Sequence, residues 1–294
     1  MATVNDWIEG ARVRTLPAAA GPVLLGAGAA WRLNAFSPGK AALALIVALA
    51  LQVGVNYAND YSDGIRGSDL ERVGPPRLTG GGLAKPKQVL RAALVSFAVA
   101  ALAGVALTIW SGVWLFLAVG ALALVAAWFY TGGKNPYGYR GLGEVAVFIF
   151  FGLVAVLGTE YTQAGAVSWI GLGGAVAIGT ISSSVNLANN LRDIPSDTAS
   201  GKVTLAVRLG DRNTRYLYTA LALTPFVVSL LLATQLWFLV LALLALPLAL
   251  KGILVALRGN RGPALIPLIK TTGQAMLVWA VITAAVLFLN APGL

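Results

Sequence analysis

The chain has 294 residues, of which 58% are hydrophobic and only 11% are charged, and its formal net charge is +10. Soluble domains carry about 25% charged residues, so this composition excludes an ordinary soluble protein and predicts an all-α, multi-pass membrane protein. The chain contains no Cys and no His, which excludes disulfides, zinc sites built on thiolate or imidazole, and histidine general bases.

Charge-free stretches mark the expected membrane spans in chain order. The first is 15–31, and the others are 41–59, 92–133, 145–159, 161–191, 216–250 and 271–294. A helix needs about 20 residues to cross a bilayer, so 92–133 and 216–250 each predict two helices. The sequence therefore predicts nine transmembrane helices around a central cavity. Arg12 and Arg14 before the first stretch also resemble the start of a signal peptide, but we interpret this stretch as a retained helix.

The basic residues predict the orientation of these helices. If the N-terminus is cytoplasmic, all of the 21 Lys and Arg except Arg32 and Lys40 lie on the cytoplasmic side. This distribution follows the positive-inside rule and predicts a protein of the cell membrane. Anionic lipids at the cytoplasmic face account for the positive net charge, so no nucleic-acid partner is expected.

One polar phrase occurs twice, each time at the end of a long apolar stretch. Both copies match N-x-A-N-[DN]-x-x-D, at residues 56–63 and 186–193, and each precedes a further acid, Asp69 or Asp197. We interpret the pair as an internal parallel repeat of about residues 1–130 and 131–260, followed by a last helix, within a single domain 1–294. Chance recurrence of a short Asn/Asp phrase is the alternative.

The polar side chains of each copy follow helical spacing. One helix face carries Gln52, Asn56, Asp60 and Asp63, and another carries Asn186, Asn190, Asp193 and Asp197. Carboxylates at the edge of a bilayer are costly, so both stripes are expected to face a cavity rather than lipid. If the two helices face each other, their carboxylates converge. The alternative is that these acids cap helices or face solvent.

Because the chain has no His or Cys beside these acids, they predict a metal site with oxygen ligands only. Such a site suits Mg²⁺, Ca²⁺ or Mn²⁺. The expected ligands are Asp60, Asp63, Asp69, Asp193 and Asp197, with the amides of Asn56, Asn59, Asn186 and Asn190 expected to bind substrate beside them. Basic residues follow both copies: Arg66, Arg72, Arg77, Lys85 and Lys87, then Arg192, Lys202 and Arg208. A metal with Arg and Lys is a usual clamp on a diphosphate, although each basic residue alone also fits the positive-inside rule.

Thr79-Gly80-Gly81-Gly82 lacks the pattern and the strand context of a phosphate loop, so we interpret it as a flexible connector.

The two motifs carry a resemblance. Asn59-Asp60-Tyr-Ser-Asp63 resembles the N-D-x-x-D core of the UbiA superfamily of intramembrane aromatic prenyltransferases, and Asp193-Ile-Pro-Ser-Asp197 resembles its D-x-x-x-D motif. The resemblance extends over most of the chain. Segments 59–69, 130–144 and 189–210 are most similar to the branch that prenylates 1,4-dihydroxy-2-naphthoate in menaquinone biosynthesis. Gly67 stands where many superfamily members have a third Asp, and the next acid is Asp69.

The resemblance implies a Mg²⁺-dependent enzyme whose active site faces the cytoplasm. A polyprenyl diphosphate would ionise at its allylic C–O bond, and the electron-rich naphthoate ring would attack the cation and lose carboxylate, giving demethylmenaquinol. The implied residues on the diphosphate are Asp60, Asp63, Asp193 and Asp197 through Mg²⁺, with Arg66, Arg77 and Lys202. The isoprenoid tail would lie in a groove open to lipid. Neither the length of that tail nor the oligomeric state follows from the sequence.

Residues 134–144 follow the fourth expected helix on the same face. Lys134, Tyr139 and Arg140 are candidates to bind the carboxylate of the aromatic acid, or to act at its ring hydroxyl. The alternative is a Tyr/Arg anchor at the membrane interface. Glu144 is a candidate partner of Arg140.

Two other functions fit part of the pattern. One is prenylation of another acceptor within the same superfamily, such as 4-hydroxybenzoate, homogentisate, a haem or a chlorin. The other is a cation-coupled transporter, which also uses internal repeats and intramembrane acids. Transporters place their sites near the bilayer midplane, whereas these acids lie at cytoplasmic helix ends, beside basic loops.

Overall fold

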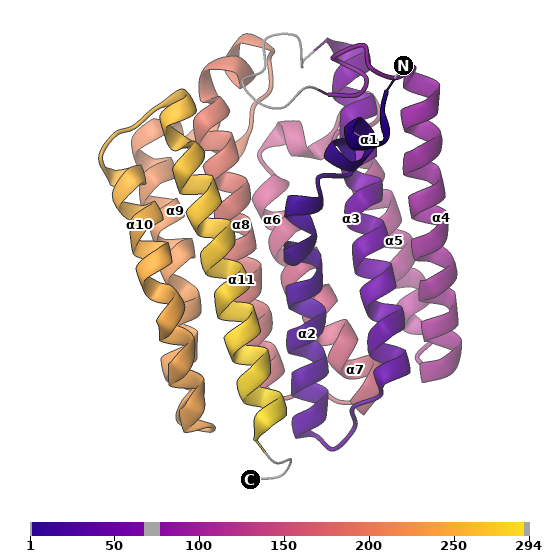
Figure 1. The fold of residues 1–294 in the computed structure, drawn as a ribbon, viewed down its shortest axis with the longest axis vertical. Helices are drawn as coiled ribbons and strands as arrows, with labels where there is room; N and C mark the ends of the chain where they lie inside the picture. The colour runs from indigo at the N-terminus through magenta and orange to yellow at the C-terminus, as the bar shows by residue number, and fades with distance from the viewer. Residues whose placement is uncertain (1, 68–76, 291–294) are drawn as a thin grey trace.

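The computed structural model describes residues 2–67 and 77–290, and helices form all the regular secondary structure within them. A short helix, α1 (Val4–Ala11), lies at one end of the bundle (Figure 1). The long segments are α2 (Leu16–Arg32), α3 (Pro38–Arg66), α4 (Pro86–Ser111), α5 (Leu115–Phe129), α6 (Gly143–Val147) continued by η3 (Phe148–Leu157) and α7 (Gly158–Ala164), α8 (Trp169–Ala199), α9 (Leu205–Leu232), η4 (Trp237–Ala245) continued by α10 (Leu246–Leu257), and η5 (Gly262–Leu265) continued by α11 (Ile266–Leu289). Two short turns, η1 (Val13–Thr15) and η2 (Tyr137–Arg140), lie between them.

Seven of the described helical segments are long and apolar enough to cross a membrane. They are α3, α4, the α6–η3–α7 rod, α8, α9, η4–α10 and η5–α11. Two shorter helices accompany them, the apolar α5 with 15 residues and α2 with 17. Large apolar side chains such as Leu102 (72% exposed) and Leu115 (70% exposed) cover the outer surface, as lipid contact requires. The prediction of an all-α membrane protein is confirmed.

The ends of α3 and α8 follow from local sequence. α3 begins after Ser37, whose side chain accepts the N–H of Lys40, and it ends at Gly67, which has a φ of +73°. Glycine is favoured in this left-handed conformation because it lacks a Cβ. The glycine that replaces the third motif Asp therefore serves as the cap of α3. α8 begins after Ser168, whose side chain accepts the N–H of Gly171.

Neighbouring helices pack in hairpins and through small residues. α3 packs along α4, α8 packs along α9, and α2 packs against α11. η3 lies against α8 at Gly152 and Gly179, where a Cβ on Gly152 would come within 2.6 Å of the carbonyl oxygen of Ala175. Such small residues allow helix backbones to approach closely in a membrane. η3 is π-helical over its ten residues, a rare form that is frequent at functional sites.

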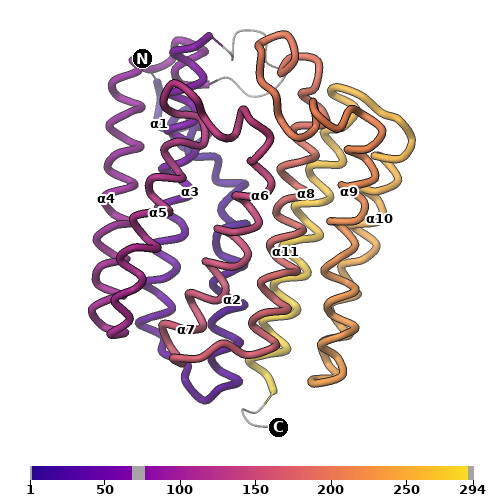
Figure 2. The backbone as a smooth tube through the Cα atoms, turned by 180° about the vertical axis from the view of Figure 1, so that it is seen from behind, coloured from indigo at the N-terminus to yellow at the C-terminus, as the bar shows by residue number. Residues whose placement is uncertain are grey.

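The C-terminal ends of α3 and α8 lie at the same end of the bundle (Figures 1 and 2). This end also carries α1 and the loop of residues 130–142. Because α3 and α8 carry the two copies of the polar phrase, the fold brings both acidic ends to one end of the bundle.

Candidate active site

A cavity of about 390 Å³ separates the two polar helix faces. α3 contributes Gln52, Asn56 and Asn59 to its wall, and α8 contributes Asn186 and Asn189. All five amides lie within about four turns of the C-terminal ends of their helices, so one end of the cavity is polar. Gln52 and Asn56 of the α3 stripe and Asn186 of the α8 stripe therefore face a shared space.

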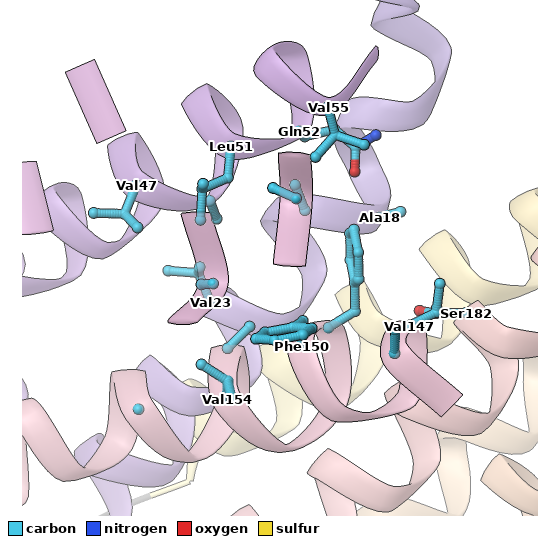
Figure 3. Close-up of a pocket in the computed structure, with 18 of the residues that line it drawn as sticks. Ala18, Val23, Val47, Leu51, Gln52, Val55, Val147, Phe150, Val154 and Ser182 are labelled. Atoms are coloured by element: carbon cyan, nitrogen blue, oxygen red, sulfur yellow. The ribbon is translucent and has the colours of Figure 1, made fainter. Parts of the chain in front are cut away.

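The rest of the cavity wall is mostly apolar. Figure 3 shows Phe150 of η3 between Val147 and Val154, with Leu51 and Val55 of α3 across the space. The part of α3 from Ala44 to Asn59 measures about 22 Å at the helical rise of about 1.5 Å per residue, and both of these residues line the cavity. The cavity is therefore long and narrow.

A shallower groove continues the cavity toward the surface. It lies between α5 and the η3–α7 rod and shares Phe116, Val119, Val154 and Gly158 with the cavity. Val113, Leu115 and Val167 complete its apolar wall near the other end of the bundle. This arrangement gives the apolar part of the cavity a side that can face lipid.

Above the polar end of the cavity, Asp63, Tyr139 and Lys202 form a compact cluster. The Tyr139 hydroxyl donates to Asp63 Oδ1 at 2.5 Å, and Lys202 Nζ lies 3.7 Å from the same oxygen. Lys202 Nζ is also 4.6 Å from the centroid of the Tyr139 ring, and Arg66 Cζ lies 5.6 Å from that centroid. The structure thus brings together four residues that the sequence predicted for the site, from three separate segments.

Backbone contacts hold this cluster in place. The N–H of Val203 donates to the carbonyl of Tyr139 at 3.0 Å, and the N–H of Lys202 donates to the carbonyl of Asp197 at 2.8 Å. Arg66 donates to the carbonyls of Thr131 and Gly133. The loops after α5 and α8 are therefore joined to each other and to the end of α3.

The charge of Lys202 is stabilised in this setting. Burial lowers the pKa of Lys202, but the carboxylate of Asp63, together with Tyr139 and Asp197, outweighs burial and raises this pKa above its ordinary value. Lys202 is therefore a fixed cation at neutral pH, placed between the acids of α3 and α8. A fixed cation beside carboxylates is the arrangement that binds a diphosphate together with a metal ion.

Asp193 and Asp197 lie on the last turns of α8. Arg192 donates from Nε and Nη2 to the two carboxylate oxygens of Asp193, both at 2.6 Å. Asp197 is half-buried, and its backbone carbonyl receives the Lys202 N–H. Both carboxylates thus lie at the same end as Asp63, each with a basic residue beside it.

Asp60 has a different environment from the other motif acids. It is fully buried, and its two oxygens accept the backbone N–H groups of Leu78 (2.9 Å) and Thr79 (2.8 Å). Gly64, one turn further along α3, permits this contact, since a Cβ there would lie 2.5 Å from Thr79 Cβ. The side chain of Asp60 therefore anchors the segment that begins at residue 77. Thr79 and Gly80 pack against α3 at Gly64, whereas Gly81 and Gly82 are exposed, so only the start of the expected connector is held on α3.

Asn56 lines the cavity, but its side-chain amide already has hydrogen-bond partners in the protein. Its Nδ2 donates to the carbonyl of Ala11 at 2.9 Å and to Thr15 Oγ1 at 3.1 Å, and Gln52 donates to its Oδ1 at 3.3 Å. The Tyr57 hydroxyl donates to the carbonyl of Trp7 at 2.9 Å. This part of α3 therefore holds the N-terminal segment across the mouth of the cavity.

Asn186 and Asn190 contact the buried carboxylate of Glu144, for which the sequence predicted a different partner. Both donate from Nδ2 to Glu144 Oε1, at 3.2 and 2.7 Å. The expected pairing of Glu144 with Arg140 is wrong, because Arg140 is exposed and Glu144 is only 4% exposed. A buried carboxylate accepts amide donors in place of water, which explains this pairing.

The other predicted residues lie at the edge of the site or outside it. Lys134 and Arg140 are exposed and make no hydrogen bond or ion pair within residues 2–67 and 77–290. Arg77 is half-buried at the start of the anchored segment. Asn59 accepts a hydrogen bond from Thr131 Oγ1 at 2.7 Å. Asp69 and Arg72 lie outside the described residues.

Several residues at the site had no assigned role from sequence. Tyr130 and Tyr137 line the cavity, and their rings meet edge to face with centroids 5.6 Å apart. Burial raises the pKa of Tyr137 to about 12. Arg12 reaches the cavity wall from the N-terminal segment. In the sequence, only the position of these residues points to the site. Each lies next to an expected membrane span, at the end of the bundle that carries the acids.

The available ligands suit Mg²⁺ at this end of the bundle. Among the described residues, no three Asp or Glu side chains approach closely enough to enclose a metal by themselves. Mg²⁺ does not require such a cage, because it keeps several waters and binds one or two carboxylates together with substrate phosphates. Asp63, Asp193 and Asp197 supply only oxygen donors and lie at the same end of the bundle, so they fit this ion.

Comparison with known proteins agrees with this geometry. The UbiA prenyltransferase family matches residues 19–266 of the chain. A 1,4-dihydroxy-2-naphthoate octaprenyltransferase of Mycobacterium tuberculosis is 55% identical over 287 residues, which cover 98% of each chain. A protein of the same description from Escherichia coli is 36% identical, over 97% of this chain and 95% of the relative.

Solved structures share the fold at low sequence identity. A UbiA homologue from Aeropyrum pernix K1 aligns with a TM-score of 0.70 and 15% identity, over 92% of this chain and 97% of its own. A UbiA homologue from Archaeoglobus fulgidus, solved with DMAPP and Mg²⁺, aligns with a TM-score of 0.69 and 13% identity, over 97% of this chain and 100% of its own. The helical bundle, its paired acidic motifs and the family match lead to one conclusion: the chain belongs to the UbiA prenyltransferase family.

Proposed function

We propose that this protein transfers a polyprenyl group from a polyprenyl diphosphate to 1,4-dihydroxy-2-naphthoate, with loss of carboxylate, and so forms demethylmenaquinol. The relatives from M. tuberculosis and E. coli carry this substrate in their names, and the first of them matches almost the whole chain. The single observation that carries the proposal is the cavity between α3 and α8. It is polar beneath Asp63 and Lys202 and apolar over the rest of its length.

The diphosphate binds at the polar end in this proposal. Lys202, Arg66 and Arg77 provide positive charge there, and Asp63, Asp193 and Asp197 hold Mg²⁺. When bound, Mg²⁺ stabilises the negative charge that develops on the leaving diphosphate. Asp60 is assigned a positioning role, because both of its oxygens hold the segment at residues 78 and 79. Asp69, outside the described residues, stays a predicted ligand.

The protein's own residues then favour ionisation of the allylic C–O bond. Lys202 keeps its charge at neutral pH and faces the diphosphate oxygens, so it stabilises the leaving group more strongly as charge develops there. Tyr139 orients Asp63 through their hydrogen bond. The allylic cation forms below this cluster, at the polar end of the cavity, where the naphthoate ring attacks it as the nucleophile.

The isoprenoid tail lies along the apolar part of the cavity. The groove between α5 and the η3–α7 rod gives the tail a route to lipid, since it shares four wall residues with the cavity. A polyprenyl chain is insoluble in water, so a membrane-embedded cavity with a lateral opening suits this substrate.

The membrane arrangement belongs to the same proposal. α2 and α5 cross the bilayer together with the seven longer segments, which gives nine spans with a cytoplasmic N-terminus in the cell membrane. The basic residues support this orientation because they lie almost entirely at the site end of the bundle. The chain forms one domain, and the α3–α4 and α8–α9 hairpins correspond as the two parallel repeats.

Product analysis tests the proposal. Purified protein with Mg²⁺, a short prenyl diphosphate and 1,4-dihydroxy-2-naphthoate should yield the prenylated, decarboxylated quinol by mass spectrometry. Parallel reactions with 4-hydroxybenzoate and homogentisate identify the acceptor. Prenylation of one of these and not of the naphthoate would replace the acceptor while keeping the family. No product with any acceptor would overturn the proposal.

A further inference from the structure

A buried carboxylate, Glu144, lies behind the polar end of the cavity and has no part in the chemistry described above. It is 4% exposed, and its Oε1 accepts Nδ2 of Asn186 and Nδ2 of Asn190. The Ser183 hydroxyl donates to the backbone carbonyl of Glu144 at 2.9 Å. Three contacts from α8 thus fix the start of α6 and the position of this carboxylate.

Glu144 gives the amide of Asn186 a single orientation. The carboxylate oxygen that faces α8 acts as an acceptor, so the NH₂ group of Asn186 turns toward it and Asn186 Oδ1 turns the other way. Asn186 Oδ1 accepts a hydrogen bond from the Tyr130 hydroxyl at 3.3 Å. Burial, with a further contribution from Glu144, raises the pKa of Tyr130 above its ordinary value. Tyr130 therefore stays protonated and serves as the donor in this contact.

The three residues form a directed chain that starts at the cavity wall. Tyr130 donates to Asn186, and Asn186 donates to Glu144. Tyr130 and Asn186 line the cavity, whereas Glu144 lies behind them. The Tyr130 hydrogen and one of the two Asn186 N–H hydrogens are directed away from the cavity in these contacts, and the lone pairs left on Tyr130 Oη and Asn186 Oδ1 are acceptors. Such a pair of oxygens binds a hydroxyl and disfavours a phosphate or carboxylate oxygen.

The place of this pair suits the acceptor substrate. Asn186 precedes Asp193 by about two helical turns, which places it about 10 Å deeper along α8. The diphosphate binds near Asp193 in the proposed function, so a ring held at Asn186 lies on the cavity side of the bond that breaks. The naphthoate, 4-hydroxybenzoate and homogentisate acceptors named above all carry a ring hydroxyl, the donor that this pair of oxygens requires.

We propose that Tyr130 and Asn186 bind a ring hydroxyl of the aromatic acceptor, and that Glu144 is the positioning residue that keeps Asn186 turned toward it. This inference rests on the proposed function, because it assigns the acceptor to this end of the cavity. It extends that function by naming the subsite that recognises the hydroxyl.

Removing the Tyr130 hydroxyl tests the subsite. Tyr130→Phe should raise the KM for 1,4-dihydroxy-2-naphthoate about tenfold, the effect of losing one buried hydrogen bond, and leave the KM for the prenyl diphosphate unchanged. Tyr137→Phe is the matched control. Tyr137 also lines the cavity, but its hydroxyl donates to the backbone carbonyl of Ala126 at 2.9 Å. An equal rise in both variants would overturn the assignment.

Two substitutions at Glu144 separate positioning from proton transfer. Glu144→Gln keeps an oxygen that accepts both amides, so kcat and the acceptor KM should stay within about twofold of the wild type. Glu144→Leu removes that oxygen and should raise the acceptor KM to the level of Tyr130→Phe. A large loss of kcat in Glu144→Gln would mean that Glu144 takes a proton, and would overturn its positioning role.

A measurement of ligand binding tests the inference independently of turnover. Calorimetry with the full wild-type chain in nanodiscs compares 1,4-dihydroxy-2-naphthoate with its two monohydroxy analogues, 1-hydroxy-2-naphthoate and 4-hydroxy-2-naphthoate. One of the two analogues should bind about tenfold more weakly than the dihydroxy compound, because it lacks the hydroxyl that the subsite binds. In Tyr130→Phe this difference in affinity should disappear. If Tyr130→Phe weakens all three ligands equally, its hydroxyl has only a structural role. Product formation with unchanged discrimination would refute the hydroxyl subsite alone, whereas no product with any acceptor would refute the proposed function.

Discussion

Asp60 and Asp63 lie one turn apart on α3, yet their carboxylates have different partners. Asp60 holds the backbone N–H groups of Leu78 and Thr79, whereas Asp63 contacts Tyr139 and Lys202. Adjacent acids in one motif therefore serve two separate purposes, one in holding a loop and one at the substrate end of the cavity. Substitutions at the two positions should have distinct effects.

Asp60→Asn should destabilise the protein and leave its metal requirement unchanged. The Asn amide has one acceptor oxygen for two backbone N–H donors, so its NH₂ group faces one of these donors. Losing that hydrogen bond costs about 1–3 kcal/mol of stability. Thermal unfolding and limited proteolysis near residues 77–83 measure this change. A higher Mg²⁺ concentration for half-maximal activity, with unchanged stability, would instead identify Asp60 as a metal ligand.

Asp63→Asn and Asp193→Asn should each lower turnover by about 100-fold or more, because each removes a charge expected to stabilise the leaving diphosphate. Both variants should remain folded by circular dichroism. After treatment with a chelator, activity of the wild type should return on addition of Mg²⁺, while the variants should stay inactive. Glu9→Gln is the control, since Glu9 is exposed and pairs only at the surface with Arg14. Near-normal turnover in both variants would refute the metal assignment.

Lys202→Met should lower turnover and weaken prenyl diphosphate binding, and Lys202→Arg should restore part of both. The raised pKa of Lys202 also predicts a pH dependence of stability. A cation whose pKa is higher in the folded state stabilises that state fully below its unfolded pKa of about 10.4, and this contribution is lost as pH rises through the folded value. The difference in Tm between wild type and Lys202→Met should therefore be constant from about pH 6 to 9 and shrink above about pH 10.5. A difference that already disappears near neutral pH would contradict the raised pKa.

Single-cysteine labelling can determine the orientation, because the chain has no cysteine of its own. Lys134→Cys lies in the exposed loop at the site end, and Gln235→Cys lies in the exposed loop that follows α9 at the other end. With a cytoplasmic N-terminus, a membrane-impermeant maleimide should label Lys134→Cys only in inverted vesicles and Gln235→Cys only in intact cells. The opposite pattern would reverse the proposed topology.

The sequence predicted the helical bundle and the polar faces of α3 and α8, because charge-free stretches and four-residue spacing are local signals. It also predicted Asp63, Tyr139 and Lys202 as neighbours in function. It could not separate Asp60 from Asp63, since the hydrogen bonds of Asp60 reach residues 78 and 79 beyond a long loop. The partners of Glu144 are likewise on a helix distant in sequence. Long-range contacts of this kind leave no periodic pattern in the chain.

The cavity predicts control over the length of the prenyl chain. Gly120 of α5 lines the cavity, and a Cβ built there meets no atom within 4 Å, so Gly120→Phe can place a ring in the apolar channel without moving the backbone. This variant should keep activity with a short donor such as geranyl diphosphate and lose about tenfold or more of its activity with long polyprenyl donors, because burial of the distal isoprene units is blocked.

Gly273→Phe is the matched control, since Gly273 of α11 also has open space around a Cβ but lies outside the cavity wall. Competition between short and long donors, read by mass spectrometry, measures the change in preference. Equal loss with both donors in Gly120→Phe would show that the tail does not pass this residue, and would direct the search for its path to another part of the bundle.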